Sequence, residues 1–181
     1  GSSTAPVSTT EPTPVTATGV ITGFGSVYVN GVRYDTSSAE VEFEDDSRAK
    51  TEDDLRLGMK VVVEGTRSGS ARTADRIHYD RDLKGPVDSI APNPTDPSIG
   101  SLLLLGQTVL VDANTVFDDL GDANLDGSVD LRDLAPAPDP VIVEISGFAT
   151  TDGFLATRIE RAEATDDDSD DDGEVKGVVS A

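Results

Sequence analysis

The residues with the clearest chemical spacing lie in one short stretch, GDANLDGSVDLRDL, between Gly121 and Leu134. Six oxygen donors stand at positions 1, 3, 5, 7, 9 and 12 of a twelve-residue loop, namely Asp122, Asn124, Asp126, Ser128, Asp130 and Asp133. Ser128 would contribute its backbone carbonyl, and Gly127 at position 6 permits a sharp turn. Because Ca²⁺ takes about six to eight oxygen ligands, this spacing predicts a calcium-binding loop with these residues as metal ligands.

The end of the loop departs from the usual EF-hand sequence, because Asp133 stands where a bidentate glutamate is typical. In this respect the loop resembles the calcium loops of dockerin modules. The resemblance ends there, since Pro136, Pro138 and Pro140 follow and exclude a long second helix. We expect at most one helical turn, over 131–134, to close the site. The alternative is an acidic surface turn without an ion, which an aspartate-rich chain can produce by chance.

The composition limits the classes of partner. The chain of 181 residues has 35 Asp and Glu against 14 Lys and Arg, a formal net charge of −21. Such an acidic surface repels phosphate backbones, so no nucleic-acid partner is expected. The absence of cysteine excludes a disulfide framework and a thiolate metal site. No run of 18 apolar residues occurs, so no membrane span is predicted.

The sequence offers little for catalysis. His78 is the single histidine, which excludes a histidine-based triad or a zinc site built on several imidazoles. Its alternation with Ile77 and Tyr79 along a strand predicts a solvent-facing side chain. Paired carboxylates of the glycosidase kind cannot be singled out in so acidic a chain. We therefore predict a protein that is not an enzyme.

Short β-strands dominate the remaining sequence, and they occur twice. Asn30-Gly31, between VYV and VRY, is a strong hairpin signal. The second copy repeats the first in the same order: 100–112 follows the pattern of 25–35, 141–147 that of 59–65, and 156–160 that of 73–77. Because small twisted sheets hide their edges by closing, the repeat predicts an all-β protein of two tandem small β-barrel, OB-like modules.

The alternation of apolar residues predicts a separate core for each module. In the first module the predicted core residues are Val27, Val29, Val61, Val63 and Ile77. In the second they are Leu103, Leu105, Val109, Val141, Val143 and Ile159.

The predicted organisation has five parts: an extended Ser/Thr/Pro-rich tail at 1–18, module 1 at 19–83, module 2 at 84–164 with the calcium-like loop at 122–133, an acidic linker at 165–173, and a further strand at 174–181. The last strand either opens another module or is donated to a neighbouring molecule. Continuation is favoured, because each copy already has its own first strand.

Three segments carry a resemblance to a known family: GVITGFGSVYVNGVRYDTS, DLRLGMKVVVEG and TADRI. They resemble a bacterial repeat domain of unknown function, DUF5666, found in tandem in exported proteins. The resemblance covers both copies and implies a small β-barrel, export and a tandem arrangement, but no substrate and no catalytic residues. The second copy departs from the pattern by a Pro-rich insertion at 91–98 and by the calcium-like loop.

Together these features predict an exported, calcium-stabilised structural or adhesive module at the cell surface or in an extracellular assembly. A precursor with a lipid-modified cysteine is one route to a surface anchor for the tail. The expected partners are calcium and, through strand addition into a filament, copies of the chain itself. The alternative is a ligand-binding β-barrel for oligosaccharide or peptide. The chain has no Trp and only 3 Tyr, which favours the structural role, because sugar-binding faces usually expose aromatic rings.

Overall fold

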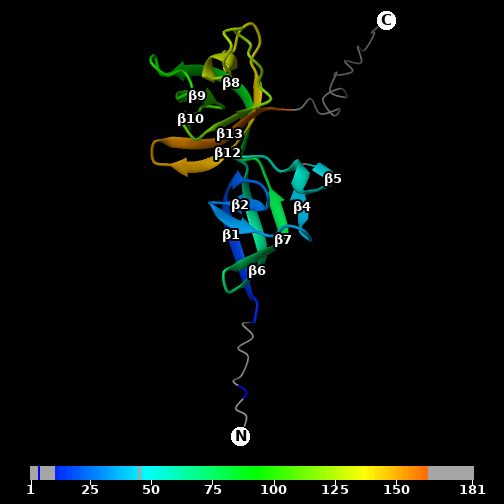
Figure 1. Cartoon of the computed structure of the whole chain (residues 1–181). Helices are drawn as coiled ribbons and strands as arrows, with labels where there is room; N and C mark the ends of the chain where they lie inside the picture. Colours follow the sequence, from blue (N-terminus) through cyan, green and yellow to red (C-terminus); the bar gives the residue numbers. More distant parts are fainter. Residues whose placement is uncertain (1–3, 5–10, 45, 163–181) are drawn as a thin grey trace, which may run out of the picture.

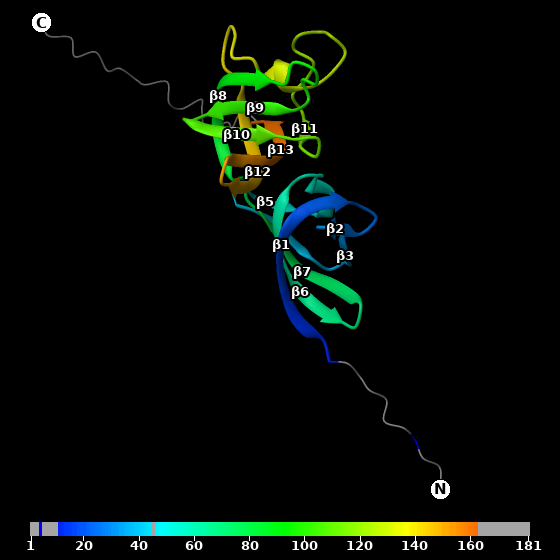
Figure 2. The same ribbon diagram turned by 90° about the vertical axis from the view of Figure 1, so that its left-hand side faces the viewer.

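The computed structural model describes residues 4, 11–44 and 46–162, and within them it contains thirteen β-strands and two short 3₁₀ helices. Figures 1 and 2 show β1 to β7 in one module and β8 to β13 in a second, arranged end to end. The prediction of an all-β protein with two β modules is confirmed. The predicted acidic linker at 165–173 and the strand at 174–181 lie outside the described residues.

Module 1 is a sheet in the order β3-β2-β1-β6-β7-β4-β5. Its elements are β1 (Thr13–Gly23), β2 (Val27–Val29), β3 (Val32–Tyr34), β4 (Glu40–Phe43), β5 (Asp46–Lys50), η1 (Glu52–Asp54), β6 (Lys60–Ser68) and β7 (Ala71–Tyr79). A parallel bridge between Asp35 and Thr73 joins the end of β3 to β7. It rests on hydrogen bonds from Asp35 N to Arg72 O at 2.9 Å and from Ala74 N to Asp35 O at 2.8 Å. The bridge closes β1, β2, β3, β7 and β6 into a barrel.

Module 2 repeats this plan. Its elements are β8 (Leu83–Pro92), β9 (Gly100–Leu104), β10 (Gln107–Val111), β11 (Val116–Asp118), η2 (Leu131–Leu134), β12 (Ile142–Thr150) and β13 (Gly153–Arg161). The sheet order is β10-β9-β8-β12-β13-β11, and parallel pairing of β10 with β13 closes the ring of five strands. In both modules the third barrel strand is therefore parallel to the last, as expected for an OB-like barrel.

Each barrel encloses its own apolar core, as predicted. All five core residues predicted for module 1 are buried. In module 2, Val109, Val143 and Ile159 are buried and Val141 packs against them. The prediction for Leu103 and Leu105 is wrong, since these side chains are 36% and 65% exposed.

The error at Leu103 and Leu105 has a physical cause. Leu102 and Leu104 point into the core instead, with 2% and 0% exposure. Four leucines in succession show no alternation, so the run itself does not indicate which face points inward. Leu105 also lies in the β9–β10 turn with φ of 51°, outside the strand.

Two predicted local elements are present, and one predicted module boundary is displaced. The hairpin at Asn30-Gly31 is present, because β2 and β3 pair on either side of it. The predicted helical turn at 131–134 is found as η2. Strand β1 begins at Thr13, before the module boundary predicted at residue 19, because it pairs with β6 as far as Arg67. In the described part of the chain no helix has the length and apolar character needed to cross a membrane.

Candidate functional site

The first half of the predicted calcium loop folds as a series of turns made by its own side chains. Asp122 accepts hydrogen bonds from Asp126 N at 3.1 Å and from Gly127 N at 2.7 Å. Asn124 Oδ1 accepts from Asp126 N at 3.0 Å, and Asp126 Oδ1 accepts from Ser128 N at 3.0 Å. Four of the predicted ligand residues therefore share one tight turn, with Gly127 at a φ of 90° where a side chain would be strained.

The second half of the loop is anchored in the core of module 2. Asp133 Oδ1 accepts from Ala123 N at 2.7 Å, and Asp133 Oδ2 accepts from Asp130 N at 2.9 Å. This carboxylate, at position 12, ties the start of the loop to its end. Leu131 and Leu134 in η2 are fully buried on either side of it. The sequence places a capping aspartate between two core leucines, which fixes the loop on the barrel.

Arg132 is the residue of this loop that sequence reasoning missed. Its Nη2 lies 2.5 Å from Asp126 Oδ2 and 2.6 Å from Asp130 Oδ2. Hydrogen bonding from Arg132 holds the pKa of Asp130 below its usual value, and the same bond raises the pKa of Arg132. The carboxylates at positions 5 and 9 thus face a guanidinium.

This arrangement bears directly on metal binding. Among the residues that the structure describes, no three His, Cys, Asp or Glu side chains are positioned together to hold a metal ion. The six predicted ligand residues lie on one loop, but Asp126 and Asp130 pair with Arg132 and do not converge with the others on one point. A calcium ion would have to replace the Arg132 guanidinium.

A second group of polar residues, which we call the joint, connects the modules. Lys60 Nζ lies 2.6 Å from Asp82 Oδ1 and donates to Gly147 O at 2.8 Å. Asp82 Oδ2 accepts from Gly147 N at 2.9 Å. The Lys60 ammonium also lies 5.0 Å from the centre of the Phe148 ring. A residue of β6, a residue of the connection and the bend of β12 are therefore held together.

Arg158 on β13 forms the other half of the joint. Its side chain is only 3% exposed, and Nη1 donates to Leu57 O of module 1 at 2.9 Å. Nη2 lies 2.5 Å from Asp118 Oδ2 and 2.7 Å from Glu160 Oε2. Burial opposes the charge of Arg158, but the bonds to Glu160 and Asp118 outweigh it and leave its pKa raised. The pKa of Asp118 is lowered by the same hydrogen bond.

Close backbone contact completes the joint. Thr157 Oγ1 donates to Gly58 O at 2.7 Å, and a Cβ at residue 58 would lie 2.6 Å from Thr157 O. Gly58 also has φ of 81°, so a side chain here would be both strained and crowded. Ser146 Oγ and Tyr79 Oη lie 3.3 Å apart, and burial raises the pKa of Tyr79 to about 12.

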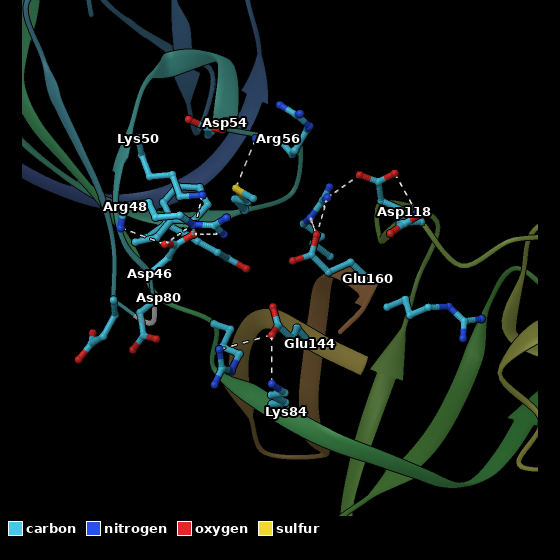
Figure 3. Close-up of a pocket in the computed structure, with 18 residues that line it drawn as sticks. Asp46, Arg48, Lys50, Asp54, Arg56, Asp80, Lys84, Asp118, Glu144 and Glu160 are labelled. Atoms are coloured by element: carbon cyan, nitrogen blue, oxygen red, sulfur yellow. Dashed lines mark hydrogen bonds and ion pairs between the residues drawn. The ribbon is translucent and has the colours of Figure 1, made fainter. Parts of the chain in front are cut away.

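Beside the joint lies a cleft with a volume of about 590 Å³. Figure 3 shows side chains of both modules facing one another across it. We call it the inter-module cleft. Seven of the 14 basic residues of the chain line it, which are Arg48, Lys50, Arg56, Arg81, Lys84, Arg158 and Arg161. Eight carboxylates line it too: Glu44, Asp46, Asp54, Asp80, Asp118, Asp119, Glu144 and Glu160.

Ion pairs inside the cleft group several cations around single carboxylates. Asp46 lies 2.8 Å from Arg48 and 2.7 Å from Lys50, and hydrogen bonds from these two residues hold its pKa well below the usual range. Glu144 lies 3.4 Å from Arg81 and 3.7 Å from Lys84. Asp46 and Glu144 each form ion pairs with two basic side chains.

Arg56 and Arg161 differ from the other cations of the cleft. Arg56 Nη1 donates to Leu55 O at 2.9 Å and to Asp53 O, and Arg161 Nη2 donates to Leu120 O at 3.1 Å. Neither guanidinium forms an ion pair with a residue that the structure describes. Both side chains lie at the surface of the cleft.

His78 lies on the outer face of β7 and does not line the cleft, although its partner Glu44 does. Its Nε2 is 3.2 Å from Glu44 Oε2, its Nδ1 is 3.8 Å from Glu42 Oε2, and the side chain is 35% exposed. The solvent-facing position predicted for it is confirmed.

Two closed five-stranded barrels, packed through a polar joint, define a tandem repeat of OB-like modules. The chain belongs to the family described as Domain of unknown function (DUF5666), which matches residues 14–78 and 84–160. There is one match for each barrel, so the tandem repeat expected from the sequence is confirmed. No curated protein and no solved structure matches the chain.

Proposed function

We propose that this protein is a non-enzymatic, exported structural or adhesive module that works as a stiff spacer of tandem barrels. The main support for this proposal is the direct contact between the two modules at the joint. Only residues 80–82 connect β7 to β8, and buried Arg158 bonds directly to the backbone of the preceding module. Repeats in direct contact with their neighbours form stacked arrays in which each barrel fixes the direction of the next.

Calcium stabilisation is a further part of the proposal. The twelve-residue spacing and the turns around Asp122 support it, and Gly127 provides the sharp turn that such loops need. When bound, Ca²⁺ would supply charge neutralisation and rigidity to the loop. Asp122, Asn124, Asp126, Asp130 and Asp133 would hold it with side-chain oxygens and Ser128 with its carbonyl. Because Arg132 already neutralises two of these carboxylates, we expect weak binding, about 10⁻⁴–10⁻³ M.

Display at the cell surface and growth into filaments by strand addition belong to the same proposal. The two sheet orders end in β5 and β11, which are the edges available to a neighbouring strand among the described elements. The net charge of −21 is compatible with a saline, calcium-containing exterior.

Calorimetric unfolding tests the spacer role. Because the joint couples the barrels, the parent protein should unfold in a single transition. Gly58→Ala should separate the transitions of the two modules, since the added Cβ crowds Thr157 O. The matched control is Gly69→Ala, which also introduces a side chain at positive φ, 61°, but meets nothing within 4 Å. Two separate transitions in the parent protein would contradict the proposal.

The second candidate is a ligand-binding protein for oligosaccharide or peptide. The inter-module cleft favours it, because its volume of about 590 Å³ lies within the range of small-molecule sites. A barrel pair can act as a spacer and still carry such a site, so the two candidates are tested separately.

A further inference from the structure

Charge is distributed very unevenly over this chain. The inter-module cleft has seven basic and eight acidic residues, so it is close to neutral. The rest of the chain keeps 14 − 7 = 7 basic and 35 − 8 = 27 acidic residues, a net charge of −20. So acidic a chain repels an anionic ligand, and the residues that line the cleft carry almost none of this net charge.

Two basic side chains of the cleft form no ion pair with a described residue. Asp46 and Glu144 each serve two cations, and Arg158 is already enclosed by Asp118 and Glu160. Among the described residues, Arg56 and Arg161 donate hydrogen bonds to backbone carbonyl oxygens and form no ion pair, although the charge of Arg56 helps to lower the pKa of Asp118. A guanidinium has five N–H donors in a planar fork that matches a carboxylate. Both arginines therefore keep N–H donors for a ligand.

The remaining lining indicates a hydroxyl-rich ligand. Of the 18 lining residues only Phe43, Met59 and Tyr79 are apolar or aromatic. Tyr79 and Met59 are buried in the core of module 1, and Lys50 Nζ lies 5.0 Å from the centre of the Phe43 ring, so the cleft offers little apolar surface. Charged donors and acceptors without an open apolar wall suit the hydroxyl groups of a sugar better than an acyl chain or an apolar peptide side chain.

We propose that the inter-module cleft binds an acidic oligosaccharide of uronic-acid type, with Arg56 and Arg161 binding its carboxylates. The walls come from both modules, with Arg56 in module 1 and Arg161 in module 2, so the site exists only while the joint holds the barrels together. This assignment does not depend on calcium or on filament growth.

Isothermal titration calorimetry with digalacturonic acid tests the site, and a neutral galactose disaccharide serves as the matched probe. We expect binding of the acidic disaccharide alone. Arg56→Gln and Arg161→Gln should each weaken it by about tenfold. Arg33→Gln makes the same change of charge on β3, outside the cleft, and should leave the affinity unchanged.

Three results would overturn the proposal. The first is no binding of digalacturonic acid up to about 10 mM. The second is equal binding of the neutral disaccharide, and the third is an equal loss in the Arg33→Gln variant. Arg56→Gln also removes hydrogen bonds from Arg56 to the backbone of its own loop, which could alter the loop itself. Lys84→Gln is therefore measured as a second variant of the cleft. It should also weaken binding while leaving the contacts of Arg56 in place.

Discussion

Asn30 Oδ1 accepts a hydrogen bond from the backbone N–H of Val20 at 2.9 Å, and module 2 has different residues at both of the corresponding positions. Pro86 stands where module 1 has Val20, and Leu105 stands where it has Asn30. Proline has no N–H, so the amide acceptor is not needed in module 2. An asparagine acceptor is therefore found in the turn of the module whose first strand has an N–H to donate, and not in the turn of the other module.

The geometry of the two positions is otherwise the same. Asn30 and Leu105 both have φ of 51°. A Cβ at Gly19 would lie 2.3 Å from the Asn30 side chain, and a Cβ at Gly85 would lie 3.0 Å from the Leu105 side chain. Each turn residue therefore covers the corresponding glycine of the first strand.

Asn30→Leu should lower the free energy of unfolding by about 0.5–1.5 kcal/mol, because Val20 N–H loses its protein acceptor. Leu105→Asn is the matched variant in module 2. It should be neutral or slightly stabilising, since asparagine tolerates positive φ better than leucine and breaks no hydrogen bond. Urea unfolding of the two variants measures the difference. An equal loss of stability in both would show that the Asn30 bond contributes nothing.

Arg132→Gln should strengthen calcium binding by about tenfold, because the guanidinium competes with the ion for Asp126 and Asp130. Asp126→Ala should abolish binding. Calorimetric titration measures both, and Arg72→Gln on β7 controls for the change in net charge. The calcium proposal fails if millimolar calcium leaves the melting temperature of the parent and of Arg132→Gln unchanged, because a ligand of the native state must stabilise it.

Tyr79 should make the protein less stable at high pH. Burial raises its folded pKa to about 12, above the ordinary value of about 10 for the unfolded chain. The contribution of Tyr79 to the free energy of unfolding is fully present below the unfolded pKa. It is lost as the pH rises through the folded pKa. Between about pH 10 and 12 the free energy of unfolding should fall by about 2 kcal/mol from this group. Tyr79→Phe should remove that part of the slope in urea unfolding, and an unchanged slope would contradict the assignment.

Arg158→Gln should cost about 3 kcal/mol of unfolding free energy. The variant removes the bond to Leu57 O and leaves Asp118 and Glu160 without their shared cation. Arg76→Gln on β7 is the matched control, because Arg76 contacts its carboxylates only at 3.8–3.9 Å and is half exposed. A similar small effect of both substitutions, measured by urea unfolding, would mean that the joint contributes little.

Much of the fold is predictable because its signals are local. The Asn30-Gly31 turn fixes a hairpin, and the repeat of strand patterns divides the chain into two barrels. The helical turn at 131–134 follows from the prolines beyond it. The inward face of the leucine run is not predictable in the same way, because four apolar residues in succession fit either face.

The joint and the inter-module cleft leave no such local signal. Thr157 bonds to Gly58 across 99 residues and Arg158 to Leu57 across 101. Nothing in the pattern around these residues indicates that they meet. Arg132 was missed for a different reason. The calcium-loop pattern specifies only the positions of the oxygen ligands, and Arg132 stands at a position where the pattern accepts any residue.

If the joint is stiff, the distance between points on the two modules is fixed, and that distance can be measured in solution. The chain has no cysteine, so Ser70→Cys in the β6–β7 turn and Ala113→Cys after β10 allow specific attachment of two fluorophores at exposed positions. Single-molecule energy transfer should give one narrow distance distribution, which Gly58→Ala broadens and Gly69→Ala leaves unchanged. A broad distribution in the parent protein, no narrower than that of Gly58→Ala, would mean that the joint does not hold the two barrels in a fixed arrangement.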